Sequence, residues 1–169
     1  MSTRDEMDEQ LFQALRDIDL QMARLPFDEL KAHYTAVGER MAPQFAAAGH
    51  PDLALDARRM VAENILCAAL DARPADECEQ LLGDVIALGF SNLHHRAQII
   101  YMVCGYFSHD PDHEELAQGL RDRYLLPLHA DLTSALQNEE QKVYRFFLDR
   151  CNTLLARLEH REEPASPTP

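Results

Sequence analysis

Apolar residues recur every three or four positions along almost the whole chain, which is the repeat of one face of an α-helix. The first run has spacings of four, four, three and four, in Met7, Leu11, Leu15, Ile18 and Met22. The runs that follow keep the same repeat and lack the alternation of a half-buried strand. The residues that they place on inward faces are Leu30, Tyr34, Val37, Met41 and Phe45; Leu53, Ala57, Met60, Val61, Ile65 and Ala69; Cys78, Leu81, Leu82, Val85 and Ile86; Leu93, Ala97, Ile100, Val103 or Cys104, and Phe107; Leu116, Leu120 and Tyr124; Leu128, Leu132 and Leu136; and Val143, Phe147, Cys151, Leu154 and Leu158.

Proline, glycine and short polar residues divide the first half of the chain into helices. Pro26 ends the first helix, and Asp28 is the expected N-cap of the second. Within that second helix, Gly38 allows a close helix crossing, and Pro43 is expected to kink or shorten the helix. Gly49 suits the left-handed position that closes a helix.

The second half carries similar signals. Ser91 or Asn92 is expected to cap the helix that ends near Phe107, and Asp110 caps another that has Pro111 in its first turn. Pro127 is expected to interrupt the chain before a short helix. A last helix opens with a predicted capping box, Asn138 with Gln141.

Together these signals predict an all-α fold, a single bundle of seven to eight antiparallel helices over residues 1–160, with a disordered Pro-rich tail at 161–169. The most apolar segment, AQIIYMVCGYF, is expected to be the central helix of the core; a β-strand is the competing interpretation, because Ile, Tyr and Val favour strands. A solenoid of helical hairpins is an alternative arrangement, since residues 28–71 have the length of a tetratricopeptide unit. The later hairpins do not repeat that pattern.

The charge balance narrows the classes of partner. The net charge is −13, and sixteen basic residues are scattered among twenty-nine acidic ones. Nucleic acids and anionic membrane surfaces are disfavoured, because both require clustered Lys and Arg. The partner expected from the charge is another protein, one with a basic surface.

The cysteines and the apolar runs indicate a cytoplasmic protein. Cys67, Cys78, Cys104 and Cys151 form no CxxC pair, and three of them fall within apolar helical stripes. The first ten residues are charged and lack the apolar core of a signal peptide. No apolar run approaches the roughly 20 residues of a membrane span.

The sequence lacks the common catalytic and cofactor-binding motifs, and one polar cluster is the main candidate for a metal site. The chain has no GxSxG, no glycine-rich phosphate loop and no HExxH motif. His109, Asp112 and His113 are types of residue that can ligate a divalent metal, but Pro111 lies between the two histidines. A helix start explains the cluster better, because acidic residues stabilise the positive end of a helix dipole. We therefore expect no catalytic, cofactor-binding or metal-binding residues, and no enzyme.

One stretch resembles a known family. Leu88-Gly89-Phe90, a helix ending Gly105-Tyr106-Phe107, then His109-Asp110-Pro111, a Leu-rich helix and Glu140-Gln141-Lys142 resemble helical proteins of bacterial type VI secretion clusters. The stretch, about residues 88–147, is similar to the C-terminal helical lobe of adaptor-chaperones that load toxins onto the secretion spike. The first 88 residues show no counterpart of the mixed α/β lobe of such adaptors. The resemblance thus implies a small accessory, chaperone-like or immunity protein.

The resulting expectation is a protein-binding helical module, serving as an accessory chaperone or adaptor for a secreted bacterial effector. Three alternatives stay open: an immunity protein that neutralises a toxin, a metal-dependent helical enzyme that uses His109, Asp112 and His113, and a structural homodimer that buries the first helix.

Overall fold

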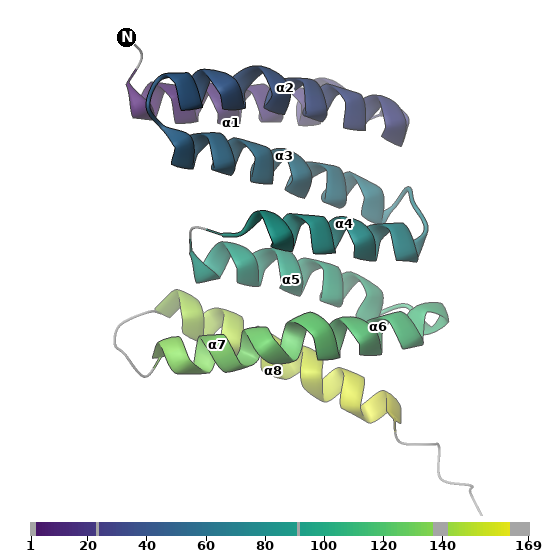
Figure 1. Cartoon of the computed structure of the whole chain (residues 1–169). Helices are drawn as coiled ribbons and strands as arrows, with labels where there is room; N and C mark the ends of the chain where they lie inside the picture. The colour runs from purple at the N-terminus through teal and green to yellow at the C-terminus, as the bar shows by residue number, and fades with distance from the viewer. Residues whose placement is uncertain (1–2, 23, 91, 137–141, 163–169) are drawn as a thin grey trace, which may run out of the picture. The chain divides into compact units, whose positions relative to one another are not determined.

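The computed structural model describes residues 3–22, 24–90, 92–136 and 142–162. Within these ranges the chain forms eight α-helices, one 3-10 turn and one π-helical turn, and no β-strand (Figure 1). The predicted all-α class and the predicted number of helices are therefore confirmed. The chain divides into two compact units, Met1–Phe90 and Ser91–Pro169, and the single domain expected over 1–160 stays a prediction.

The first unit contains four helices, in which each helix lies antiparallel to the next along the chain (Figure 1). Helix α2 packs against both α1 and α3, and α3 also packs against α4. Most residues of the predicted inward stripes are in the core, among them the fully buried Leu11, Phe45, Leu53 and Leu82. The repeat does not place Leu66 inward, but this residue is fully buried as well. The helices are α1 (Arg4–Met22), α2 (Phe27–Ala47), α3 (Pro51–Leu70) and α4 (Ala75–Leu88).

Gly38 lies at the contact between α2 and α3, as its position in the sequence predicts. A Cβ at Gly38 would lie 3.3 Å from Val61 Cγ2, which is closer than most packed carbon atoms approach. Pro43 does not shorten α2, which continues for another turn to Ala47. The loop after α2 has Gly49 at φ 87°, the left-handed conformation that glycine adopts without strain.

The expected N-cap of α2, Asp28, is wrong by two positions, because the N-cap is Pro26. The helix begins at Phe27, directly after Pro26, so Asp28 lies in the first turn and does not cap it. Its carboxylate still lies near the positive end of the helix dipole, together with that of Glu29.

The second unit is built around α5 (Leu93–Ser108), which packs against α6, the π turn and α8. The predicted cap at Asn92 is confirmed, because its side chain accepts a hydrogen bond from the His95 amide. Asp110 accepts a hydrogen bond from the Asp112 amide, but it caps a 3-10 turn and not the α-helix that follows, whose N-cap is His113. The other elements are the 3-10 turn (Pro111–His113), α6 (Glu114–Leu120), the π turn (Arg121–Leu125), α7 (Leu126–Leu136) and α8 (Lys142–Glu162). The capping box predicted at Asn138 and Gln141, and residues 163–169 of the predicted tail, lie outside the described residues.

Pro127 does not break the chain into two helices. Figure 1 shows α6, the π turn and α7 as one continuous helical rod. Proline has no amide hydrogen and its ring crowds the preceding turn, and here that turn is widened to the π geometry. The widening also changes the inward face, because Leu125 is fully buried whereas Tyr124, which the regular repeat places inward, is half-buried.

Candidate functional site

The three residues that the metal-dependent alternative would use, His109, Asp112 and His113, do not assemble around one point. His113 Nδ1 lies 2.7 Å from Asp110 Oδ2, while His109 Nε2 lies 2.8 Å from Arg157 Nη1 on α8. Because a guanidinium can only donate, His109 accepts this hydrogen bond. Asp112 is exposed. No group of three or more His, Cys, Asp or Glu residues that could hold a metal ion is found among the described residues.

The buried cysteines do not form a reactive site. None of the four is disulfide-bonded, and only Cys67 is exposed. Burial raises the pKa of Cys104 to about 12 and that of Cys151 to about 11. A thiol with so high a pKa stays protonated at neutral pH and is a poor nucleophile.

The first unit has a pocket of about 410 Å³ between the end of α1, the beginning of α2 and the end of α3. Its walls are mainly apolar, its only charged lining residues are Asp19 and Asp71, and neither Lys nor Arg lines it in the described part of the chain. We call it the α1–α3 pocket. It is lined by Asp19, Leu25, Phe27, Leu30, Tyr34, Asn64, Cys67, Ala68, Asp71 and Ala72.

Hydrogen bonding and burial set the chemistry of the α1–α3 pocket. The Tyr34 hydroxyl donates to Asp19 Oδ1, and burial together with this carboxylate raises the pKa of Tyr34. The pKa of the Cys67 thiol is also raised, mainly by desolvation and further by the carboxylates of Glu63 and Asp19. The phenol and the thiol therefore stay neutral, and the negative charge of the pocket resides on its two aspartates.

The second unit exposes an aromatic surface on α5 and α8. The Arg150 guanidinium lies 4.2 Å from the centre of the Phe146 ring and 5.2 Å from that of Tyr101. Phe146 and Val143 are each 49% exposed. We call Tyr101, Val143, Phe146 and Arg150 the α5–α8 aromatic surface.

The repeat in the sequence predicts α8 only in part. Cys151, Leu154 and Leu158 are buried as expected, but Val143 is exposed and Phe147 only half-buried. The signal that could have revealed this surface is the segment KVYRFFL, because its apolar residues cover more than one face of a helix. Some of them must therefore face outward.

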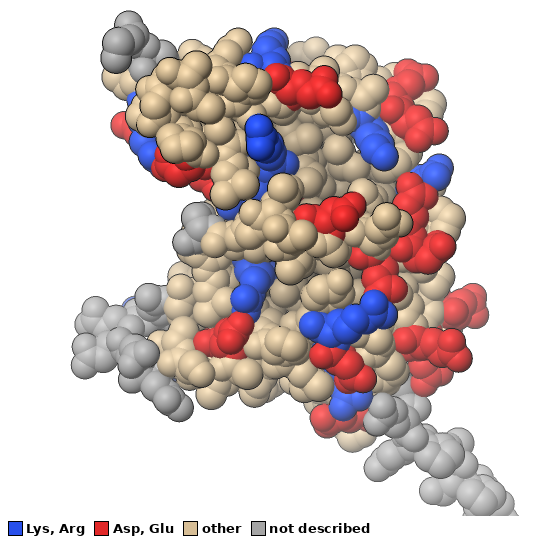
Figure 2. Space-filling model, in the orientation of Figure 1, with Lys and Arg blue, Asp and Glu red and all other residues tan. Residues whose placement is uncertain are grey.

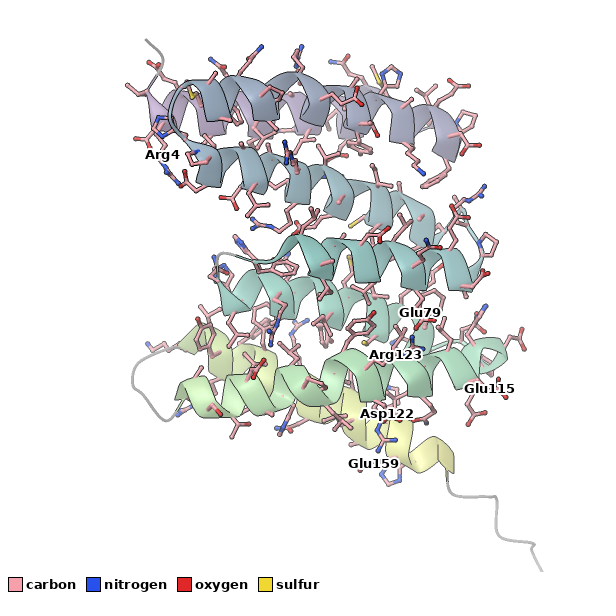
Figure 3. The ribbon with its side chains drawn as sticks, in the orientation of Figure 1. Arg4, Glu79, Glu115, Asp122, Arg123 and Glu159 are labelled. Atoms are coloured by element: carbon pink, nitrogen blue, oxygen red, sulfur yellow. The ribbon has the colours of Figure 1, made fainter. Side chains whose placement is uncertain are left out.

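Charged side chains of the two signs are intermixed on the surface. On the face drawn in Figure 2, Lys and Arg lie among Asp and Glu and form no continuous basic patch in the described part of the chain. In the second unit, Glu115 on α6, Asp122 on the π turn and Glu159 on α8 are exposed carboxylates (Figure 3).

None of the helices, as far as their residues are described, combines the length and the apolar character needed to cross a bilayer. Comparisons with known protein families, with curated proteins and with solved structures find no match to this chain.

Proposed function

We propose that this chain is a protein-binding helical module that acts in the cytoplasm as an accessory chaperone or adaptor for a secreted effector. The α5–α8 aromatic surface carries this proposal. Tyr and Arg are enriched at the energetic centres of protein interfaces, and aromatic residues in general are enriched there relative to the rest of the surface. Here Arg150 already lies between two aromatic rings, so its side chain is partly ordered before a partner binds.

The exposed area gives the energy that a partner could gain. Covering the exposed half of Phe146 removes on the order of 100 Å² of apolar surface from water, which is worth about 2 kcal/mol. That value corresponds to a factor of about 30 in affinity.

The net charge supports a basic partner. A protein of charge −13 attracts positively charged surfaces and accelerates their association at low ionic strength. The resemblance to type VI secretion proteins agrees with a partner that is a secreted effector or toxin.

The test is co-expression of the tagged full chain with each protein encoded by a neighbouring gene, followed by calorimetry on the purified pairs. We expect one neighbour to bind, and Phe146→Ala to weaken its affinity about 30-fold. Phe12→Ala is the matched control, because Phe12 is 52% exposed on α1 and should leave the affinity unchanged. If no neighbour binds, or if both variants weaken binding equally, the proposal is wrong.

The alternatives have different outcomes in the same preparations. An immunity protein would protect cells that express the bound toxin, whereas a chaperone or adaptor would raise the yield or secretion of its effector. A homodimer through the α1 stripe would need Leu11, Leu15 and Ile18, but these residues are buried in the first unit.

A further inference from the structure

The α1–α3 pocket combines a concave apolar surface with charge of one sign. Its volume of about 410 Å³ falls within the usual range for ligand pockets, roughly 300–1,000 Å³. Phe27, Leu30 and the buried ring of Tyr34 supply apolar walls, while Asp19 and Asp71 supply the charge. A ligand that matches both properties is apolar along its length and cationic at its end.

The carboxylate of Asp19 also acts on the ionisable side chains beside it in the pocket. Burial is the main cause of the raised pKa of Tyr34 on α2 and of Cys67 on α3, and the Asp19 carboxylate raises both pKa values further. Glu63 adds to this effect at Cys67. Burial disfavours a charge of either sign, so only the contribution of these carboxylates favours a cation in the same space.

The chain itself shows how a guanidinium binds at this end of the unit. The Arg73 guanidinium lies over the Phe27 ring, 5.4 Å from its centre, and pairs with Glu77 at 2.8 Å. Arg73 does not line the pocket, and its charge is balanced by Glu77. Arginine is suited to such a place, because its flat, weakly hydrated head group stacks on apolar surface and can bond two carboxylate oxygens at once.

We propose that the α1–α3 pocket binds an arginine side chain, flanked by apolar residues, from an extended segment of the partner protein. This inference rests on the proposed protein-binding function and names a second contact for it. In this contact the arginine stem lies along Leu30 and Tyr34, and the guanidinium donates to Asp19 and Asp71.

Cys67 provides a direct measurement, since it lines the pocket and is the only exposed cysteine of the four. The test follows the rate at which a maleimide modifies Cys67 in the full chain while the peptide acetyl-Leu-Arg-Leu-amide is added. We expect the peptide to slow the modification in a saturable way. The same peptide with neutral citrulline in place of arginine should require about tenfold higher concentration, the loss typical of a hydrogen bond to a charged group.

Substitutions of the two pocket aspartates test whether the peptide protects Cys67 by binding in the α1–α3 pocket. Asp19→Asn and Asp71→Asn should each raise the half-protecting concentration of the arginine peptide about tenfold, and the Asp19→Asn amide keeps an oxygen that can accept from the Tyr34 hydroxyl. Asp8→Asn, on the same helix as Asp19 but outside the pocket, is the matched control and should change nothing. Far-UV circular dichroism establishes that each variant is folded.

The result that overturns the proposal is an absence of protection, equal protection by the two peptides, or an equal effect of Asp8→Asn. Phe146→Ala keeps this test separate from the proposed function, because it should weaken partner binding while leaving peptide protection intact. A chain that binds its partner through Phe146 but gives no protection of Cys67 retains the proposed function and loses this second contact.

Discussion

Replacing Gly38 with alanine tests the packing of α2 against α3 most directly. In an open helical position this change stabilises a protein by about 1 kcal/mol, because alanine has the higher helix propensity. At Gly38 the new Cβ meets Val61 Cγ2 at 3.3 Å and Val61 Cγ1 at 3.6 Å. Valine is stiff at χ1, and both of its methyl groups are in contact, so rotation of the side chain offers no relief.

The two helices must therefore separate slightly, which is overpacking with a cost of roughly 2 kcal/mol. The net expectation for Gly38→Ala is a loss of about 1 kcal/mol in unfolding free energy. In a Val61→Ala background the nearest remaining contact is the Cβ of residue 61 at 3.7 Å, an ordinary distance. There the same change should stabilise by about 1 kcal/mol, so the two sites couple by about 2 kcal/mol.

The assay is native-state hydrogen exchange of α2 peptides, which reads the opening free energy of the first unit alone. Gly105→Ala on α5 is the matched control, because no described atom lies within 4 Å of a Cβ built there, and it should stabilise the second unit by about 1 kcal/mol. A stabilising effect of Gly38→Ala in the unaltered chain would refute the reasoning, since Val61 would then offer no resistance to the added methyl group.

Three further predictions concern the thiols and one helix cap. Because burial raises the pKa of Cys104 to about 12 and that of Cys151 to about 11, from an ordinary 9.0, the unfolded chain loses these protons first. Stability should be full below about pH 9 and fall as the pH rises toward 11, and Cys104→Ala should flatten this slope in urea titrations followed from pH 8 to 11. A cationic methanethiosulfonate should modify Cys67 faster than an anionic one, relative to their rates with a small thiol; a ratio of one would mean that the carboxylates of Glu63 and Asp19 impose no negative field there. Asn92→Ala should cost about 1 kcal/mol and raise hydrogen exchange at the His95 amide, whereas unchanged exchange would mean that this cap contributes nothing.

The parts of the fold that the sequence predicts well depend on short-range signals. Leu11, Leu15 and Ile18 are buried as their spacing requires, because a helix that hides one stripe must repeat near 3.6 residues. Gly49 and Asn92 mark a turn and a cap through their own backbone and side-chain preferences, without help from distant residues.

The candidate sites depend on contacts that no local pattern contains. The α1–α3 pocket is lined by residues from Asp19 to Ala72, which three helices bring together. On α8, the packing of its neighbours decides which residues of an apolar-rich segment remain outside, and so Val143, which the repeat places inward, lies outward. Both sites are therefore results of tertiary structure.

The π turn between α6 and α7 has a consequence for how this chain can vary in length. Buried Leu120 and Leu125 are five residues apart, one more than a regular helical turn requires. The π turn therefore accommodates one extra residue, and the residues that follow it keep the same inward face. Relatives that have another residue in place of Pro127 should tolerate the deletion of one residue between these leucines. A regular helical turn would then keep the inward faces before and after it aligned. Relatives that keep the proline should keep the extra residue as well, which makes the pair a marker for aligning distant sequences across this segment.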